Sequence, residues 1–205
     1  GGAYLGMIGS LEARGHTAGY LGVVRRLIEE AELRPGETVL EAGCGTGVLD
    51  RWLARHTGRA NHIVGIDISR YVLREAAALA RQAGLEGVVE FREGSAEALP
   101  FPENNFDVVM SSTVIQRVNA DQMLREMVRV TKPGGRFLAV EPDNAARYWF
   151  SSLPSGMAAF DKARQFFAAA ASTGRETAPP AVGALLPGLL QAAGIRPLSV
   201  RLFPV

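Results

Sequence analysis

A run of glycines between a strand and a helix constrains this chain more than any other feature. The segment VLEAGCGTGVLDRWLA, residues 39–54, begins as an apolar stretch, passes through Gly43, Gly45 and Gly47, and continues with helical spacing. Three glycines in five residues indicate a sharply turned backbone that something approaches closely. The residues around the loop decide which ligand that is.

Strands and helices alternate along the whole chain. Apolar strands are predicted at about 37–42, 62–67, 87–94 and 106–112, within 132–143 after a tight turn, and at 196–205. Helices are predicted at about 20–33, 46–56, 70–83, 121–131 and 183–193, with Asn119 or Asp121 capping the fourth. This alternation predicts an α/β fold, a doubly wound and mostly parallel sheet in three α/β/α layers. The 205 residues suit a single domain, 1–205, whose ligands bind beyond the carboxyl ends of the strands.

Composition excludes several classes of function. The formal net charge of +1 provides no general attraction for nucleic acid or for an anionic membrane. A single cysteine forms no internal disulfide, and no Cys/His cluster suggests a metal. No apolar run approaches the ~20 residues of a membrane-spanning helix, and the N-terminus lacks the pattern of a signal peptide. We therefore expect a cytoplasmic globular protein that involves neither nucleic acid nor membrane.

Two acids and one valine distinguish the glycine loop from a dinucleotide site. Val48 stands where the dinucleotide pattern requires its third glycine, and no GK[ST] of a phosphate loop follows. Glu41, at the end of the first strand, would repel a pyrophosphate but suits a ligand that carries a cationic centre and an amine. Asp67, at the end of the second strand, is placed to bind two ribose hydroxyls. A cationic nucleoside without phosphate is the ligand that these residues favour.

Four ordered blocks resemble the class I S-adenosylmethionine-dependent methyltransferases. They are EAGCGTG (41–47), VGIDIS (64–69), EGSAEALPFPENNFDVVMSS (93–112) and VTKPGGRFLAVEPD (130–143). The resemblance covers about residues 39–143. It implies a Rossmann-like methyltransferase fold, S-adenosylmethionine as cofactor with S-adenosylhomocysteine as product, and methyl transfer to a small molecule.

The resemblance also implies roles for single residues. The loop from Gly43 to Gly45 would pass close to the methionine portion of the cofactor, Glu41 would orient that portion, and Asp67 would bind the ribose. Ile68 would pack on the adenine, although an ordinary core isoleucine is the alternative. Ser95 stands where the family commonly has an aspartate beside the adenine edge. The predicted cofactor contacts are Glu41, Gly43, Cys44, Gly45, Gly47, Asp67, Ile68, Ser95, Ala96 and Ser111.

Methyl transfer needs little besides positioning, because the sulfonium is already an activated electrophile. No catalytic residue is therefore evident, and His16, Tyr20 and Tyr148 are the weak candidates for a general base. Asp143-Asn144 resembles half of a magnesium site, but Ser111-Ser112 replace the acid that such a site also needs, so no metal is predicted.

Two segments outside the resemblance are expected to complete the site. Residues 1–34 are expected to cover the cofactor. Residues 144–180, rich in aromatic side chains, are expected to form a substrate cap for an apolar or aromatic acceptor that is methylated on oxygen, nitrogen or carbon.

Two other functions stay open at this point. One is a protein that binds the cofactor without transferase activity, because Ser95 departs from the family pattern and one final strand replaces the family's two. The other, less favoured, is a nicotinamide-dependent oxidoreductase. The sequence indicates neither the acceptor nor an oligomeric state.

Overall fold

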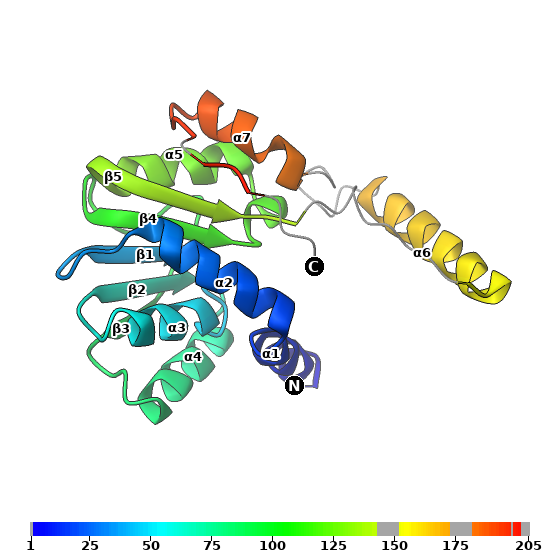
Figure 1. Cartoon of the computed structure of the whole chain (residues 1–205), viewed down its shortest axis with the longest axis horizontal. Helices are drawn as coiled ribbons and strands as arrows, with labels where there is room; N and C mark the ends of the chain where they lie inside the picture. Colours follow the sequence, from blue (N-terminus) through cyan, green and yellow to red (C-terminus); the bar gives the residue numbers. More distant parts are fainter. Residues whose placement is uncertain (1, 143–151, 173–181, 198, 202–205) are drawn as a thin grey trace.

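Five strands form one parallel sheet in the order β3-β2-β1-β4-β5 (Figure 1). The computed structural model describes residues 2–142, 152–172, 182–197 and 199–201. The strands are β1 (Thr38–Ala42), β2 (His62–Asp67), β3 (Val89–Glu93), β4 (Phe106–Ser112) and β5 (Thr131–Val140). The chain adds β2 and β3 on one side of β1 and then returns to place β4 on the other side. The carboxyl ends of β1 and β4 are therefore a topological switch point, where open α/β sheets bind ligands.

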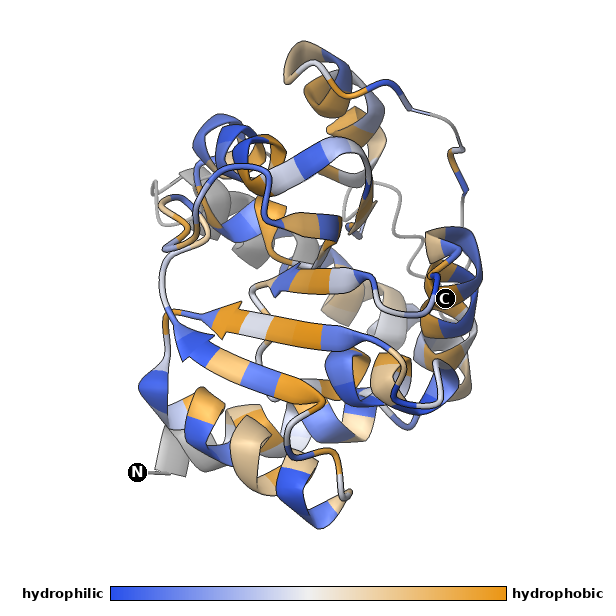
Figure 2. Cartoon of the chain, turned by 90° about the vertical axis from the view of Figure 1, so that its left-hand side faces the viewer, coloured by the Kyte–Doolittle hydropathy of each residue, from blue (hydrophilic) through white to orange (hydrophobic). Residues whose placement is uncertain are grey.

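Helices cover both faces of this sheet. They are α1 (Gly2–Arg14), α2 (Ala18–Ala31), α3 (Val48–His56), α4 (Arg70–Gln82), the short 3₁₀ helix η1 (Ile115–Arg117), α5 (Ala120–Val130), α6 (Pro154–Ser172) and α7 (Val182–Ala192). One core layer packs α2, α3 and α4 on the sheet, and the other packs α5 and α7 on the opposite face. Figure 2 shows the apolar residues that run through the strands, as expected for a sheet buried on both faces. The predicted α/β fold with three α/β/α layers is thus confirmed.

The boundaries of the predicted helices and of five predicted strands agree closely with the structure, and one predicted strand is wrong. Asn119 caps α5, and its side chain accepts a hydrogen bond from the Gln122 N–H. The helix α1, residues 2–14, precedes the predicted helical segment. The strand predicted at 196–205 is wrong for the described part of that segment, where residues 196, 197 and 199–201 form no strand. Among the described residues, no helix is both long and apolar enough to cross a bilayer.

The predicted cap segment is only partly described. Figure 1 shows α6 standing apart from the layers, on the side toward which β4 and β5 point. Residues 143–151, which include Tyr148 and the Asp143-Asn144 pair, and residues 173–181 lie outside the described residues. The cap therefore stays a prediction.

At the amino ends of the strands, one carboxylate joins three elements. Asp107 of β4 accepts hydrogen bonds from the Thr38 N–H at 2.8 Å and the Thr38 hydroxyl at 2.9 Å. The Lys132 ammonium of β5 lies 2.9 Å from both carboxylate oxygens. Partial burial raises the pKa of Asp107, but the bonds from Thr38 and Lys132 outweigh it and lower the pKa to about 2. Asp107 therefore fastens β1, β4 and β5 at the end of the sheet away from the switch point.

Asp107→Asn should lower the free energy of unfolding at pH 7 by about 1–3 kcal/mol, because donors on β1 and β5 lose a charged acceptor. The pKa of Asp107 is lower in the folded than in the unfolded chain, so its contribution is present above pH 3.8 and is lost as the pH falls to about 2. The difference between wild type and variant should shrink over that range. Urea unfolding at several pH values measures it, with the exposed Glu103→Gln as control; a constant difference would contradict the assignment.

Candidate functional site

The end of β2 holds the glycine loop through backbone and side-chain bonds. The N–H groups of Gly43 and Cys44 donate to the Ile66 carbonyl at 2.7 and 2.9 Å. The Gly45 N–H donates to Asp67 Oδ2 at 3.0 Å. The loop that leaves β1 is thus fixed against the last two residues of the neighbouring strand.

Asp67 has capacity beyond these bonds. Its Oδ1 accepts from the Ser69 N–H at 2.9 Å, so each carboxylate oxygen already has one protein donor. A carboxylate offers about four acceptor positions in all. Two remain for hydroxyl donors of a ligand. Asp67 is therefore both a structural anchor of the loop and a candidate ribose contact.

The three glycines are required for different reasons. All have positive φ, +82° at Gly43, +54° at Gly45 and +71° at Gly47, a region that side chains disfavour. A Cβ at Gly43 would lie 2.3 Å from a methyl group of Val114, and one at Gly47 would lie 2.5 Å from the Phe91 ring. At Gly45 the nearest atom is Leu11 Cδ1 at 3.5 Å, an ordinary contact. Packing within the protein thus excludes a side chain at Gly43 and Gly47, but not at Gly45.

A pair of buried carboxyl groups lies beside the loop. Glu41 of β1 is aligned with Gly65 of β2 and with Met110 of β4, and only 3% of its surface is exposed. Asp50, in the first turn of α3, is 1% exposed. A Cβ at Gly65 would lie 2.9 Å from Asp50 Oδ2, so the Asp50 carboxyl occupies the space that a side chain at position 65 would need. The missing side chain at Gly65 lets Asp50 reach Glu41.

Burial favours the protonated form of both acids of this pair and of two neighbouring side chains. It raises the pKa of Glu41 well above its usual value, and the neighbouring Asp50 raises it further. Burial raises the pKa of Asp50 to about 7. Burial and the adjacent acids also raise the pKa of the Cys44 thiol and bring that of Tyr20 to about 12. At neutral pH neither Cys44 nor Tyr20 is an available base.

The N-terminal helices contact this end of the sheet. The Glu12 carboxylate forms a 2.6 Å ion pair with Arg51, whose guanidinium also donates to the carbonyl of Thr46 in the loop. Gly15 is buried against Val48, at the start of α3. Tyr20, on α2, shares a hydrogen bond with Ser112 at the end of β4. Helices α1 and α2 are therefore connected to the glycine loop, to the start of α3 and to the end of β4.

A second acid supports the loop from the other side. The Glu141 carboxylate, just past β5, accepts hydrogen bonds from the N–H groups of Val114 and Ile115, both at 2.7 Å. These bonds hold Val114 on Gly43. Glu141 Oε2 is buried and has no hydrogen-bond partner.

The other predicted residues fall near this edge in different environments. Ile68 is 75% exposed, so it is a surface residue and the core alternative is wrong. Ser95 and Ala96 are half-buried, and Ser95 Oγ accepts from the Glu97 N–H at 3.1 Å. Ser111 is fully buried, and its hydroxyl has no partner. His16 is exposed in the turn between α1 and α2.

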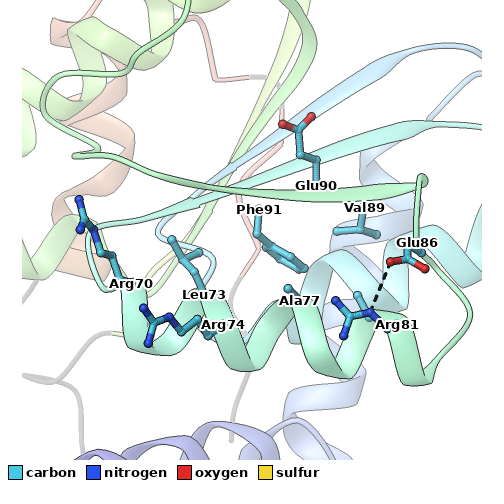
Figure 3. Close-up of a pocket in the computed structure, with 10 residues that line it drawn as sticks. Arg70, Leu73, Arg74, Ala77, Arg81, Glu86, Val89, Glu90 and Phe91 are labelled. Atoms are coloured by element: carbon cyan, nitrogen blue, oxygen red, sulfur yellow. Dashed lines mark hydrogen bonds and ion pairs between the residues drawn. The ribbon is translucent and has the colours of Figure 1, made fainter.

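One cavity of the described structure lies away from this site. It measures about 470 Å³ and lies between α4 and the edge strand β3, with Leu73, Ala77 and Phe91 on its floor and Arg70, Arg74 and Arg81 at its rim (Figure 3). None of the predicted cofactor contacts lines it. Within the described ranges, no three His, Cys, Asp or Glu side chains gather as metal ligands.

Comparison with known proteins identifies the family of the central segment. Residues 40–139 match the family described as a methyltransferase domain. This segment of the chain is thus similar to methyltransferase domains. The resemblance to the class I S-adenosylmethionine-dependent methyltransferases is thereby confirmed for this part of the chain.

Individual relatives agree with this assignment. A ubiquinone/menaquinone biosynthesis C-methyltransferase of Vibrio vulnificus is 38% identical over 118 residues, 57% of this chain and 45% of that protein. The chain thus spans about half the length of the curated relatives it matches. The YcgJ protein of Bacillus subtilis is 31% identical with a TM-score of 0.52, and the match covers 58% of this chain and 49% of the YcgJ chain. The [4+2]-cyclase SpnF is 33% identical with a TM-score of 0.55, and the match covers 59% of this chain and 45% of the cyclase.

Three residues of the site were missed by sequence reasoning. Asp50 carried a usable signal, because an acid between Leu49 and Leu53 falls on the helix face that must pack on the sheet. Val114 and Glu141 carried none, since their roles depend on the loop after β4 meeting the end of β5.

Gly43→Ala should destabilise the methyltransferase domain more than Gly36→Ala does. The two positions have nearly equal φ, +82° and +86°, but Gly36 has no atom within 4 Å of the added Cβ whereas Gly43 faces Val114. The conformation alone costs about 1–2 kcal/mol, and forced repacking adds about 1–3 kcal/mol. Denaturant unfolding of both variants measures the difference; equal losses would show that Val114 moves aside freely.

Proposed function

We propose that this chain is an S-adenosylmethionine-dependent methyltransferase that acts on a small molecule. The observation that carries the proposal is the buried Glu41 carboxyl beside the glycine loop at the topological switch point. Its Oε2 has no hydrogen-bond partner. A buried acid without a cation suits a ligand that brings the positive charge with it.

The residues present fit the cofactor. Glu41 would face the ammonium group of its methionine portion, and Asp67 would accept from the ribose hydroxyls with its two remaining acceptor positions. The exposed side chain of Ile68 would cover the adenine face. The loop at Gly45, where the free protein leaves room for a Cβ, is where the cofactor backbone would come closest. When bound, the cofactor supplies a methyl group already activated by the sulfonium.

The chain's own residues would position the reactants and exclude water. Helices α1 and α2, tied to the loop by Glu12 and Arg51 and to β4 by Tyr20, support a role of the N-terminal segment as a cover over the cofactor. The protonated Tyr20 hydroxyl would act as a hydrogen-bond donor rather than as a base. Positioning of this kind supplies about 7–11 kcal/mol of a reaction barrier.

A carbon atom of an apolar or aromatic molecule is the proposed acceptor. The relative from Vibrio vulnificus is named a C-methyltransferase of ubiquinone and menaquinone biosynthesis. The aromatic-rich segment 144–180 suits an acceptor of low polarity. A nicotinamide cofactor is disfavoured, because its pyrophosphate would meet Glu41 and Asp50 instead of a third glycine.

Ile68→Ala should weaken the binding of S-adenosylhomocysteine by about three- to tenfold without changing stability, because the side chain is exposed in the free protein. Asp67→Asn should weaken it by at least tenfold, since one charged acceptor for the ribose is lost. Calorimetric titration measures both, with the half-exposed Val128→Ala on α5 as the control that should bind normally.

The same titration separates the alternatives. Failure of the wild type to bind would contradict the cofactor assignment. Binding without methyl transfer to any member of a panel of quinols, phenols and amines, followed with methyl-labelled S-adenosylmethionine, would favour the cofactor-binding protein without transferase activity.

A further inference from the structure

Glu41 and Asp50 form a carboxyl pair that no cation neutralises. Among the described residues, no Lys, Arg or His nitrogen lies within 4 Å of either carboxylate. Arg51 is engaged by Glu12 and by the Thr46 carbonyl. The Arg14 guanidinium lies 5.1 Å from the centre of the Tyr20 ring. Two bare carboxylates in such a place would repel each other strongly.

A proton between the two groups resolves this repulsion. No donor of the described protein reaches either Asp50 oxygen or Glu41 Oε2, and the two carboxyl groups lie close enough to form a hydrogen bond with each other when one of them carries a proton. A hydrogen bond between two carboxyl groups requires that one of them be protonated. The pair therefore holds at least one proton in the ligand-free protein, and the two groups titrate together.

We propose that Asp50 is a positioning residue of the cofactor site, which shares a proton with Glu41 in the free protein and releases it when the ammonium group of the cofactor binds. This inference rests on the proposed function. The ammonium replaces the proton as the positive charge beside Glu41, and the proton leaves to solvent. Asp50 then adds a second negative charge beside the bound ammonium group, on the side of α3.

The surrounding charges favour the protonated pair. Asp67 at the end of β2 raises the pKa of Glu41, and Arg14 on α1 lowers it. Arg51 on α3 lowers the pKa of Asp50, which nevertheless reaches about 7. The neighbouring Cys44 and Tyr20 are neutral at this pH, because burial raises the pKa of each. The two arginines oppose protonation, but neither guanidinium forms an ion pair with Glu41 or Asp50 among the described residues.

The direction of the pH dependence follows from linkage. The free protein binds more protons than the complex, so affinity rises with pH, by up to about tenfold per unit while the pair holds its proton. An asparagine at position 50 removes the repulsion and offers an amide N–H to Glu41. The pKa of Glu41 is then lower than in the wild type, although burial still raises it, so fewer protons are released when the ligand binds.

The test is calorimetric titration of S-adenosylhomocysteine at pH 6.5 in buffers with different ionisation enthalpies. The dependence of the observed heat on buffer should correspond to release of about one proton per ligand by the wild type. Asp50→Asn should release clearly less, and its affinity should vary less with pH between pH 6 and 8 than that of the wild type. Glu86→Gln, an exposed acid paired with Arg81, should behave as the wild type. Equal release by wild type and Asp50→Asn, or none by the wild type, would overturn the proposal.

Stability of the ligand-free protein provides a second and independent readout. Because the pKa of Asp50 is raised on folding, the pair stabilises the folded chain at low pH, and this contribution is lost as the pH rises through about 7. The wild type should therefore become less stable between pH 5 and 8, and Asp50→Asn should reduce that decline, because it removes the acid whose pKa burial raises to about 7.

The two readouts distinguish the possible failures. A wild type that shows the stability decline but binds no S-adenosylhomocysteine would overturn the proposed function, and with it the ligand-linked release. A wild type that binds the ligand but shows no decline would overturn the shared proton alone.

Discussion

The hydrogen bonds between the end of β2 and the loop after β1 are the constraint on which the site depends. The parallel register aligns Ala42 with Ile66, so the chain leaves β1 level with the last residues of β2. The Ile66 carbonyl and the Asp67 carboxylate then take the N–H groups of a loop that cannot continue the ladder. The positive φ values of the glycines follow from this path. The same bonds leave the half-buried Asp67 with unused acceptor positions.

Carboxylates at the two ends of the sheet lie in opposite environments. At the amino ends, Asp107 is fully satisfied by Thr38 and Lys132, and its pKa falls. At the carboxyl ends, Glu41 and Asp50 lack donors, and burial raises both pKa values. The first arrangement stabilises the fold. The second is unfavourable in itself and is sustained by the apolar layers on both faces, where each fully buried aliphatic side chain contributes about 1.5–3 kcal/mol.

How much of this was predictable depends on how local each feature is. The strands and the helix at 70–82 follow from apolar periodicity, which one short window of sequence contains. The glycine loop and Asp67 were also predictable, because their pattern lies within 30 residues. The pairing of Asp50 with Glu41 was not, since it requires that Gly65 be aligned with Glu41 on the neighbouring strand. The support of Val114 by Glu141 likewise joins segments 27 residues apart through the sheet.

A shared proton explains how a fold can keep two acids at the heart of its ligand site. Removing two ionised carboxylates from water would cost several kcal/mol per ion. Each hydrogen bond of the glycine loop contributes only about 0.5–1.5 kcal/mol to the stability of the fold. With one proton between them, the pair carries at most a single negative charge, and the empty site remains foldable. A ligand that supplies a cation makes the proton unnecessary, whereas an anionic ligand would meet a charge that it cannot neutralise. The burial that makes Glu41 unfavourable in the free protein is thus the property that gives the site its preference for a positively charged ligand.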